Sequence, residues 1–359
     1  MTRPPGAAWP PLLAALLAGK HLDAADTRWA MGELLAGRAS EAQIAGFAVA
    51  LRAKGERAEE IAGLAAAMLD HAEPLSTPAD RVLVDTCGTG GDGAHTVNIS
   101  TMAALVLSGA GLAVAKHGNR AASSSCGSAD VLERLGVVID LPPAAVAACL
   151  AEAAPAFCFA PVFHPALRHA AGPRRDLGIP TFFNILGPLS NPARPAVQVV
   201  GVADERLAPV VADVLAARGI SAWVVRGHDG LDELTTTGPS QVWRCAGGSV
   251  TQHTVHPADL GIAPPAPGGL RGGDAAHNAV VVEEFLGGKR GPVRDAVLLN
   301  AAAGLVAARA VAAPDGEAAV GDPTAALAPA LEEAAAVVDD GRAAAAMERW
   351  VEVSRRHRP

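Results

Sequence analysis

Residues 85–130 concentrate glycine, hydroxyl and basic side chains in a pattern that suits a phosphorylated ligand. Two polar loops, 87–97 and 116–126, each follow a short apolar run of strand type. Each is followed by a segment with helix start signals, 98–110 and 128–135. A glycine loop between a strand and a helix N-terminus directs backbone N–H groups at an anion. Two such loops so close together predict a site for a ligand with several phosphates.

The side chains of these loops supply the donors and the charge that phosphate groups need. Gly88, Gly90 and Gly91 lack a Cβ, so the chain can adopt positive φ angles and let a ligand approach the backbone. Lys116 and Arg120 add positive charge. Neutral donors come from Asn98, Ser100, Thr101, Ser123, Ser124 and Ser128. The glycine spacing differs from that of a P-loop and of a dinucleotide-binding fold, which disfavours both.

An acidic cluster follows a later run of strand type. Asp229, Asp232 and Glu233 come after Ser-Ala-Trp-Val-Val-Arg-Gly at 221–227. Without context, three neighbouring carboxylates are an ordinary solvated loop. Opposite a phosphate site they predict Mg²⁺, which usually takes one or two carboxylates together with substrate oxygens and water.

The composition argues against several other classes of function. The chain has 359 residues and a formal net charge of −8, which disfavours nucleic-acid and membrane-surface partners. Seven Phe, five Trp and no Tyr leave few platforms on which single-stranded bases stack. Five cysteines, an odd number without Cys-x-x-Cys spacing, indicate a reduced, cytoplasmic protein. The N-terminal apolar run is too short for a membrane span and lacks the pattern of a signal peptide.

The elements that must position these residues change character near residue 80. After a loose tail over 1–10, apolar residues at helical spacing predict four helices, at 11–18, 24–36, 41–53 and 58–71. These helices carry more apolar surface than they need among themselves, so we expect a homodimer built on them. Beyond the linker at 73–80, strand-like runs alternate with helical segments, which is typical of a parallel sheet covered on both faces.

The predicted fold class is therefore α/β, with a small all-helical N-terminal domain over 1–78 and a larger domain with a mostly parallel sheet flanked by helices over 79–359. Strand-like runs occur at 82–85, 112–115, 137–140, 156–160, 196–203 and 221–227. Helices are expected at 206–218, 276–286 and 292–313, and in the alanine-rich tail from 315. Ligands of such sheets bind at the carboxyl ends of the strands, where the glycine loops lie.

Four motifs together resemble the anthranilate phosphoribosyltransferases, which belong to the nucleoside phosphorylase-like phosphoribosyltransferases. They are GTGGD at 88–92, NIST at 98–101, KHGNR at 116–120 and GSADVLE at 127–133. The resemblance extends over residues 12–310. It implies transfer of the 5-phosphoribosyl group from phosphoribosyl pyrophosphate to the amine of anthranilate, in tryptophan biosynthesis. It also implies magnesium as cofactor, with two ions, a dimer interface on the N-terminal helices, and a segment near 163–190 that packs back onto them.

The resemblance assigns roles to individual residues of this chain. Phosphoribosyl pyrophosphate would contact Gly88, Gly91, Asp92, Thr96, Asn98, Ile99, Ser100, Thr101, Lys116, His117, Gly118, Asn119, Arg120, Ala121, Ala122, Ser123, Ser124 and Ser128. Magnesium would be held by Ser100, Asp232 and Glu233. Anthranilate would contact Gly88, Asn119 and Arg174, with Arg174 paired to its carboxylate.

Two features of the chain leave roles open. His117 suits either the aromatic pocket or loop packing, and His164 suits either a site role or structural capping. The chain also departs from the family pattern at Gly172-Pro173, where Pro-Val is common, and at Pro180, where a basic residue is frequent. These changes bear on the backbone around Arg174.

No nucleophile on the protein is expected, because no Ser-His-Asp arrangement can be assembled from the motifs. Three alternatives remain. A pyrimidine nucleoside phosphorylase shares the fold, but KHGNR, GLDEL and the arginine of GPRRDLG favour transfer to anthranilate. A non-enzymatic, nucleic-acid-binding relative should be basic, whereas this chain is acidic. A paralogue in secondary metabolism would show the same residues.

Overall fold

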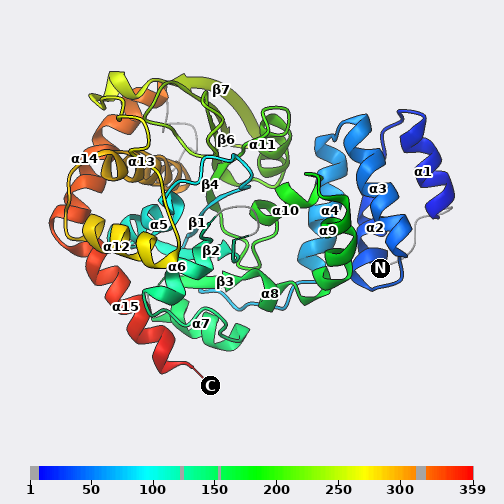
Figure 1. The fold of residues 1–359 in the computed structure, drawn as a ribbon, viewed down its shortest axis with the longest axis horizontal. Coiled ribbons are helices and arrows are strands. Elements are labelled where there is room, and N and C mark those ends of the chain that lie inside the picture. Colours follow the sequence, from blue (N-terminus) through cyan, green and yellow to red (C-terminus); the bar gives the residue numbers. More distant parts are fainter. Residues whose placement is uncertain (1–7, 122–124, 153–154, 313–320, 359) are drawn as a thin grey trace.

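The computed structural model describes residues 8–121, 125–152, 155–312 and 321–358. Its first part is a bundle of four helices at one end of the molecule (Figure 1). The helices are α1 (Trp9–Leu17), α2 (Ala24–Leu35), α3 (Glu41–Lys54) and α4 (Ala58–Asp70), close to the predicted ranges. The tail expected over 1–10 is too long, because α1 already begins at Trp9. Proline occurs in the first turn of this helix, where its missing backbone N–H removes no helical hydrogen bond. Residues 1–7 lie outside the described part.

In the described residues seven strands form one sheet in the order β3-β2-β1-β4-β5-β6-β7. They are β1 (Leu83–Gly88), β2 (Ala113–Gly118), β3 (Ala156–Phe159), β4 (Val197–Gly201), β5 (Ser221–Gly227), β6 (Ser240–Ala246) and β7 (Ser249–Val255). The first five strands in this order pair in parallel, which confirms the mostly parallel sheet. The last two form an antiparallel hairpin that the sequence reading did not include.

One predicted strand is wrong. Residues 137–140 form an irregular connection after helix α6 (Ser128–Arg134), although they read Val-Val-Ile-Asp. Val137 and Ile139 are buried against the helices instead of pairing in the sheet. Short apolar runs do not distinguish a strand from a buried connection, because both place apolar side chains against a core.

Helices cover both faces of the sheet (Figure 1). They are α5 (Ile99–Gly109), α6 (Ser128–Arg134), α7 (Pro143–Ala151), α8 (Ala160–Phe163), α9 (Ala171–Leu177), α10 (Phe183–Leu189), α11 (Ala208–Ala217), α12 (Ala275–Leu286), α13 (Pro292–Ala312), α14 (Pro323–Asp339) and α15 (Arg342–Arg356), with 3₁₀ turns η1 (Pro165–Ala170) and η2 (Pro257–Leu260). None of the described helices is long and apolar enough to cross a membrane.

Strand β5 shows how the sheet separates two cores. Trp223 and Val225 lie in the core with α5, α13 and α14, whereas Ala222 and Val224 lie in the core on the opposite face. This alternation follows from the two-residue period of a strand. Helix α13 packs against α5, β4 and β5, and α11 packs against β5 and β6.

The second core is continuous with the N-terminal bundle. Phe47 of α3 packs against Phe182, with ring centroids 5.4 Å apart. Helix α9 contacts α3, and η1 contacts α2. The stretch from η1 to α10, which connects β3 to β4, therefore lies against the bundle. An ion pair between Arg52 of α3 and Asp204 before α11, 2.7 Å long, adds a polar connection. These contacts join the bundle to the α/β part of the chain, and Met68 of α4 is the residue of the bundle that lines the cavity described below.

Candidate active site

A cavity of about 520 Å³ lies at the carboxyl ends of β1 and β2, between the sheet and the stretch from η1 to α10. It brings together every described residue that the sequence singled out for a site except Asp229. These are Gly88, Gly91, Asp92, Thr96, Asn98, Ile99, Ser100, Thr101, Lys116, His117, Gly118, Asn119, Arg120, Ala121, Ser128, Arg174, Asp232 and Glu233. Ala122, Ser123 and Ser124 lie outside the described residues. Segments far apart in the sequence thus meet at one edge of the sheet, as open α/β sheets require.

Asp232 is held against the first glycine loop by close backbone packing. Its Oδ2 accepts a hydrogen bond of 2.7 Å from the backbone N–H of Gly90. A Cβ on Gly88 would lie 2.1 Å from the same oxygen, and a Cβ on Gly201 would lie 1.5 Å from the backbone carbonyl oxygen of Asp232. Only glycine leaves room at both positions, so the ends of β1 and β4 position this carboxylate directly.

Asn300 of α13 positions the second carboxylate of the cavity, that of Glu233, through the backbone of the next residue. Its Oδ1 accepts a 2.9 Å hydrogen bond from the N–H of Leu234, and its Nδ2 donates 3.0 Å to the carbonyl oxygen of Leu234. Both residues are buried. Since Leu234 directly follows Glu233, this pair of bonds fixes the backbone that carries Glu233.

Asp229 stabilises the acidic loop and stands apart from the other two carboxylates. Its Oδ2 accepts hydrogen bonds from the hydroxyls of Thr235, at 2.7 Å, and Thr237, at 2.5 Å. Its Oδ1 accepts from the N–H of Leu231 at 3.2 Å. The three carboxylates predicted as one cluster therefore divide into a loop brace, Asp229, and a cavity pair, Asp232 and Glu233.

The surroundings of the cavity pair disfavour the ionised form of both carboxyl groups. Burial, followed by the nearby carboxylate of Asp92, raises the pKa of Asp232 to about 7. Burial and then Asp232 raise the pKa of Glu233 well above its ordinary value. A bound cation would relieve both penalties, because it stabilises the ionised carboxylates that burial and mutual repulsion disfavour.

The donor set suits magnesium that arrives with its own oxygen ligands. Within the described parts of the chain, no group of three or more His, Cys, Asp or Glu side chains is arranged to hold a metal by itself. Mg²⁺ does not need one, since it commonly binds through one or two carboxylates plus phosphate oxygens and water. Asp232, Glu233 and the hydroxyl of Ser100 line the same cavity and fit that mode.

Lys116 is buried at the base of the site. Its Nζ donates 2.6 Å to the carbonyl oxygen of Thr86 and 3.2 Å to Oγ of Ser100. The Thr86 hydroxyl in turn donates 2.8 Å to the carbonyl oxygen of Ser100, which joins the end of β1 to the first turn of α5. The ammonium group offsets part of the charge of Glu233 and lies beneath the start of α5.

His117 and His164 form a neutral pair beside the cavity, with ring centroids 5.3 Å apart. Burial lowers the pKa of His117 to about 3 and that of His164 to about 4. The Nδ1 of His117 lies 2.9 Å from the carbonyl oxygen of Gly187, so it carries the proton and donates. Nε2 of His117 is then an acceptor, and it has no hydrogen-bond partner within the described structure.

Arg174 faces the cavity from α9. Its guanidinium carbon lies 5.1 Å from the ring centroid of Phe183, and both residues line the cavity. Arg175, by contrast, points to solvent, with 79% of its side chain exposed, and pairs with Asp176. Neither Arg175 nor Arg168 lines the cavity. Of the three neighbouring arginines, Arg174 alone lines the cavity.

The departures from the family pattern near Arg174 have a local explanation. A Cβ on Gly172 would lie 3.1 Å from Oε1 of Glu41, so glycine suits the close packing of α9 on α3. Pro180 is exposed after α9 has ended at Leu177. Neither departure disturbs Arg174, whose backbone is helical within α9.

The sequence reading missed several residues of the cavity wall: Met68, Leu167, Phe183, Asn184 and Pro188. They come from α4, η1 and α10. The only local signal was the aromatic pair Phe182-Phe183 soon after the paired arginines. Their placement depends on how the bundle meets the sheet, which a single sequence does not encode locally.

The five thiols are not activated as nucleophiles. Burial raises the pKa of Cys87 and Cys158 well above the ordinary value, and that of Cys126 and Cys149 to about 11 and of Cys245 to about 12. At neutral pH all five are protonated, whereas the thiolate is the nucleophilic form. The two loop cysteines therefore have a packing role.

Comparison with known proteins identifies the family. The helical bundle domain of a glycosyl transferase family matches residues 10–72, and its α/β domain matches residues 80–344. An anthranilate phosphoribosyltransferase from Salinispora arenicola is 57% identical over 353 residues, covering 98% of each chain. The corresponding protein of Thermobifida fusca is 56% identical, covering 96% of this chain and 97% of its own.

Solved structures of the same enzyme share the fold. The anthranilate phosphoribosyltransferase of Thermus thermophilus aligns with a TM-score of 0.86 at 39% identity, covering 96% of this chain and 99% of that one. The Saccharomyces cerevisiae enzyme, in complex with phosphoribosyl pyrophosphate and magnesium, aligns with a TM-score of 0.80 at 28% identity over 99% of this chain and 95% of that one. With these relatives and both family domains in order, the chain belongs to the anthranilate phosphoribosyltransferase family.

Proposed function

We infer that this protein transfers the 5-phosphoribosyl group of phosphoribosyl pyrophosphate to the amine of anthranilate, releasing pyrophosphate, as a step of tryptophan biosynthesis. The observation that carries the inference is one cavity that joins two glycine loops, an acidic pair and Arg174. The first three features suit a metal-bound pyrophosphate, and the last suits an aromatic carboxylate. Family membership points to the same activity.

The phosphate side of the site is made of backbone and neutral donors. Gly90 and Gly91 have φ angles of 67° and 83°, so the loop after β1 turns in a way that favours glycine. Helix α5 begins at Ile99, and its N-terminal residues Asn98, Ile99 and Ser100 line the cavity, although the N–H groups of Ile99 and Thr101 already donate to the carbonyl oxygens of Val97 and Asn98. Backbone N–H groups in this arrangement stabilise charge that develops on a departing pyrophosphate.

We propose that Asp232, Glu233 and Ser100 hold magnesium. When bound, Mg²⁺ neutralises pyrophosphate charge and orients its oxygens. The number of ions, two, is proposed from the family resemblance, and, besides burial, the nearby charge of Asp92 raises the pKa of both acids. The chain's own part is to keep these carboxylates fixed, through Gly90 and Asn300, before the substrate arrives.

The anthranilate side is assigned to Arg174, Asn119 and Gly88. A guanidinium binds a carboxylate through two parallel hydrogen bonds, which fixes the direction of the neighbouring amine. Phe183 supplies an apolar surface beside Arg174. Nε2 of His117, which lines the cavity and has no partner in the described structure, is suited to accept a hydrogen bond from the amine of anthranilate. Alignment of the two substrates then accounts for much of the rate, because no protein nucleophile takes part.

We also propose that residues 1–78 form a helical domain that packs on the α/β domain of residues 79–359, and that two copies meet through the N-terminal bundle. Leu17 on α1 is 80% exposed and Val49 on α3 is 39% exposed, so the bundle retains apolar surface. A twofold contact would cover the same patch on both copies.

The test is an initial-rate assay of the purified full chain, which follows loss of anthranilate fluorescence with phosphoribosyl pyrophosphate and Mg²⁺. We expect consumption only when all three are present. Phosphorolysis of thymidine or uridine without any anthranilate consumption would assign the protein to the pyrimidine nucleoside phosphorylases instead.

A further inference from the structure

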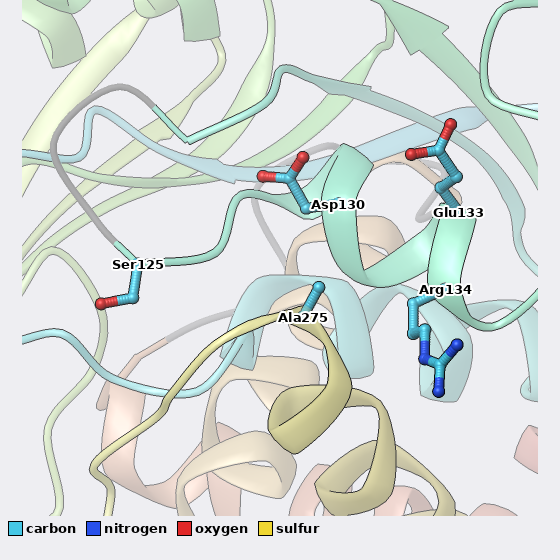
Figure 2. A pocket seen from close by; sticks show the side chains of 5 residues that line it. All are labelled: Ser125, Asp130, Glu133, Arg134 and Ala275. Atoms are coloured by element: carbon cyan, nitrogen blue, oxygen red, sulfur yellow. The ribbon is translucent and has the colours of Figure 1, made fainter.

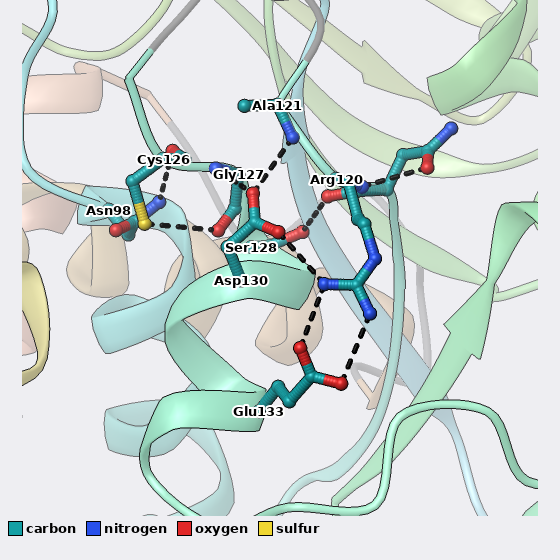
Figure 3. A network of polar contacts seen from close by, with 9 residues as sticks. Asn98, Arg120, Ala121, Cys126, Gly127, Ser128, Asp130 and Glu133 are labelled. Atoms are coloured by element: carbon teal, nitrogen blue, oxygen red, sulfur yellow. Dashed lines mark hydrogen bonds and ion pairs between the residues drawn. The ribbon is translucent and has the colours of Figure 1, made fainter. Parts of the chain in front are cut away.

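The side chain of Asp130 on α6 joins two parts of the phosphate site (Figure 3). Its Oδ2 accepts a hydrogen bond of 3.0 Å from the N–H of Ala121 and one of 2.9 Å from the N–H of Gly127. Its Oδ1 accepts 3.0 Å from Nη1 of Arg120. We call these three contacts the Asp130 bridge. They connect the segment that leaves β2 to the residue that precedes α6.

The bridge lies behind the cavity wall. Asn119, Arg120, Ala121 and Gly127 line the cavity, whereas Asp130 does not. On its outer side Asp130 borders a separate, open depression of about 580 Å³, together with Ser125, Glu133, Arg134 and Ala275 (Figure 2). Asp130 therefore reaches the site only through the residues that it holds.

The two joined parts are packed with no spare room. A Cβ on Gly127 would lie 2.4 Å from the backbone nitrogen of Ala121 and 2.6 Å from the carbonyl carbon of Arg120. The carbonyl oxygen of Asn119 accepts 3.2 Å from the N–H of Ala129 in α6. The segment 119–121 thus has one defined position against α6, and the Asp130 carboxylate is the charged group that holds its far end.

We propose that Asp130 is a positioning residue for phosphoribosyl pyrophosphate, which acts by keeping the backbone of 119–121 in its binding position before the substrate arrives. The proposal rests on the proposed function above. A segment that is already ordered loses little conformational entropy when the ligand binds, whereas a free segment lowers the apparent affinity by the fraction of time it spends in the wrong position. Affinity for the phosphorylated substrate should therefore depend on the bridge.

The competing explanation is a purely local one. Asp130 is the third residue of α6, and its bond from Gly127 is also the second half of a capping box, which stabilises a helix start. That role explains the contact with Gly127 but leaves the contacts with Ala121 and Arg120 without a purpose. Glutamate is an ordinary residue at the capping position, so it preserves the cap. Its longer side chain displaces the carboxylate from Ala121.

Glu133 provides a matched control, because it shares only one part of the bridge. Its Oε2 accepts 2.8 Å and its Oε1 accepts 3.1 Å from the guanidinium of Arg120 (Figure 3). Among the described residues, Glu133 makes no hydrogen bond to Ala121 or Gly127, whose N–H groups bond to Asp130. Glu133→Gln therefore removes the negative charge that faces Arg120. It leaves the backbone hydrogen bonds to Asp130 in place.

The experiment compares wild type, Asp130→Glu and Glu133→Gln as full chains with Mg²⁺. KM for phosphoribosyl pyrophosphate, KM for anthranilate at saturating phosphoribosyl pyrophosphate, and the thermal midpoint are measured for each. We expect Asp130→Glu to raise the first KM at least tenfold and the second less than threefold, since saturating substrate orders the segment. Its thermal midpoint should stay within a few degrees of wild type, and Glu133→Gln should stay within threefold on both KM values.

Several results would overturn the inference. A KM for phosphoribosyl pyrophosphate within threefold of wild type in Asp130→Glu would leave only the capping role. An equal loss in Glu133→Gln would place the effect on the Arg120 side chain. If Asp130→Glu does not fold, the isosteric Asp130→Asn replaces it, with an expected rise of at least threefold in the same KM, and no rise again refutes the bridge. A wild type without anthranilate turnover would instead refute the proposed function, so the two failures are distinct.

Discussion

Gly88→Ala tests whether the glycine at the end of β1 is required to position Asp232. The added Cβ would lie 2.1 Å from Oδ2 of Asp232, and real Cβ atoms essentially never approach a neighbour within 3.0 Å. The oxygen must therefore move by at least about 0.9 Å. In doing so it gives up the 2.7 Å hydrogen bond from the N–H of Gly90.

The size of the effect follows from that displacement. A hydrogen bond to a charged group contributes roughly 1.5–3 kcal/mol, which corresponds to about a ten- to hundredfold change in rate. A catalytic group misplaced by about 1 Å costs on the order of a hundredfold. We therefore expect kcat/KM of Gly88→Ala to fall about a hundredfold and the Mg²⁺ concentration at half-maximal rate to rise.

A second glycine separates this effect from simple blockage of the cavity. Gly201 does not line the cavity, yet its Cβ would lie 1.5 Å from the carbonyl oxygen of Asp232. Gly201→Ala should therefore raise the Mg²⁺ requirement as Gly88→Ala does. Gly32→Ala on α2, whose Cβ would have its nearest neighbour at 3.9 Å, serves as the neutral control. A rate within threefold of wild type in Gly88→Ala, or an unchanged Mg²⁺ dependence, would refute the positioning argument.

Three further predictions follow from the same structure. Arg174→Ala should lower kcat/KM for anthranilate about ten- to a hundredfold and leave KM for phosphoribosyl pyrophosphate unchanged. Arg175→Ala should change neither value. The reverse pattern would show that Arg175 binds the carboxylate of anthranilate. Because burial lowers the pKa of His117 to about 3 and that of His164 to about 4, the unfolded chain binds protons below about pH 6.5 that the folded chain does not. The free energy of unfolding should fall by about 2 kcal/mol per histidine between pH 8 and pH 5, and denaturant titration of wild type and a double His→Asn variant should show the difference. Light scattering should give about twice 36.1 kDa for wild type and a smaller mass for Leu17→Asp, and a wild-type monomer would contradict the proposed dimer.

Local sequence patterns were enough to predict the residues that carry charge and hydrogen-bond donors. The glycine loops and the acidic pair could be picked out from the sequence because strand, turn and helix signals lie within a few residues of them, and all of them line one cavity. The same is true of Lys116, although its partner, the carbonyl oxygen of Thr86, belongs to a neighbouring strand. The resemblance to a family then assigned roles that the pattern alone left open.

The parts that were missed depend on contacts between distant segments. The brace from Asn300 to Leu234 joins residues 66 positions apart, and the ion pair between Arg52 and Asp204 joins residues 152 apart. The hairpin of β6 and β7 extends a parallel sheet with antiparallel strands, a change that short runs of apolar residues do not signal. Likewise, the division of roles between Asp229 and the cavity pair became visible only once Thr235 was placed.

The most direct test of the account measures the products of one reaction in two proteins. Wild type and the Asp232→Asn/Glu233→Gln double variant, which keeps the shape of the side chains and removes two negative charges, are incubated with anthranilate, phosphoribosyl pyrophosphate and Mg²⁺. Anthranilate loss and pyrophosphate release are followed together. The account predicts one pyrophosphate per anthranilate consumed in wild type, and no turnover in a double variant that retains the wild-type circular dichroism spectrum. Near-normal turnover in the double variant would show that the reaction does not need the acidic pair and would contradict the central claim.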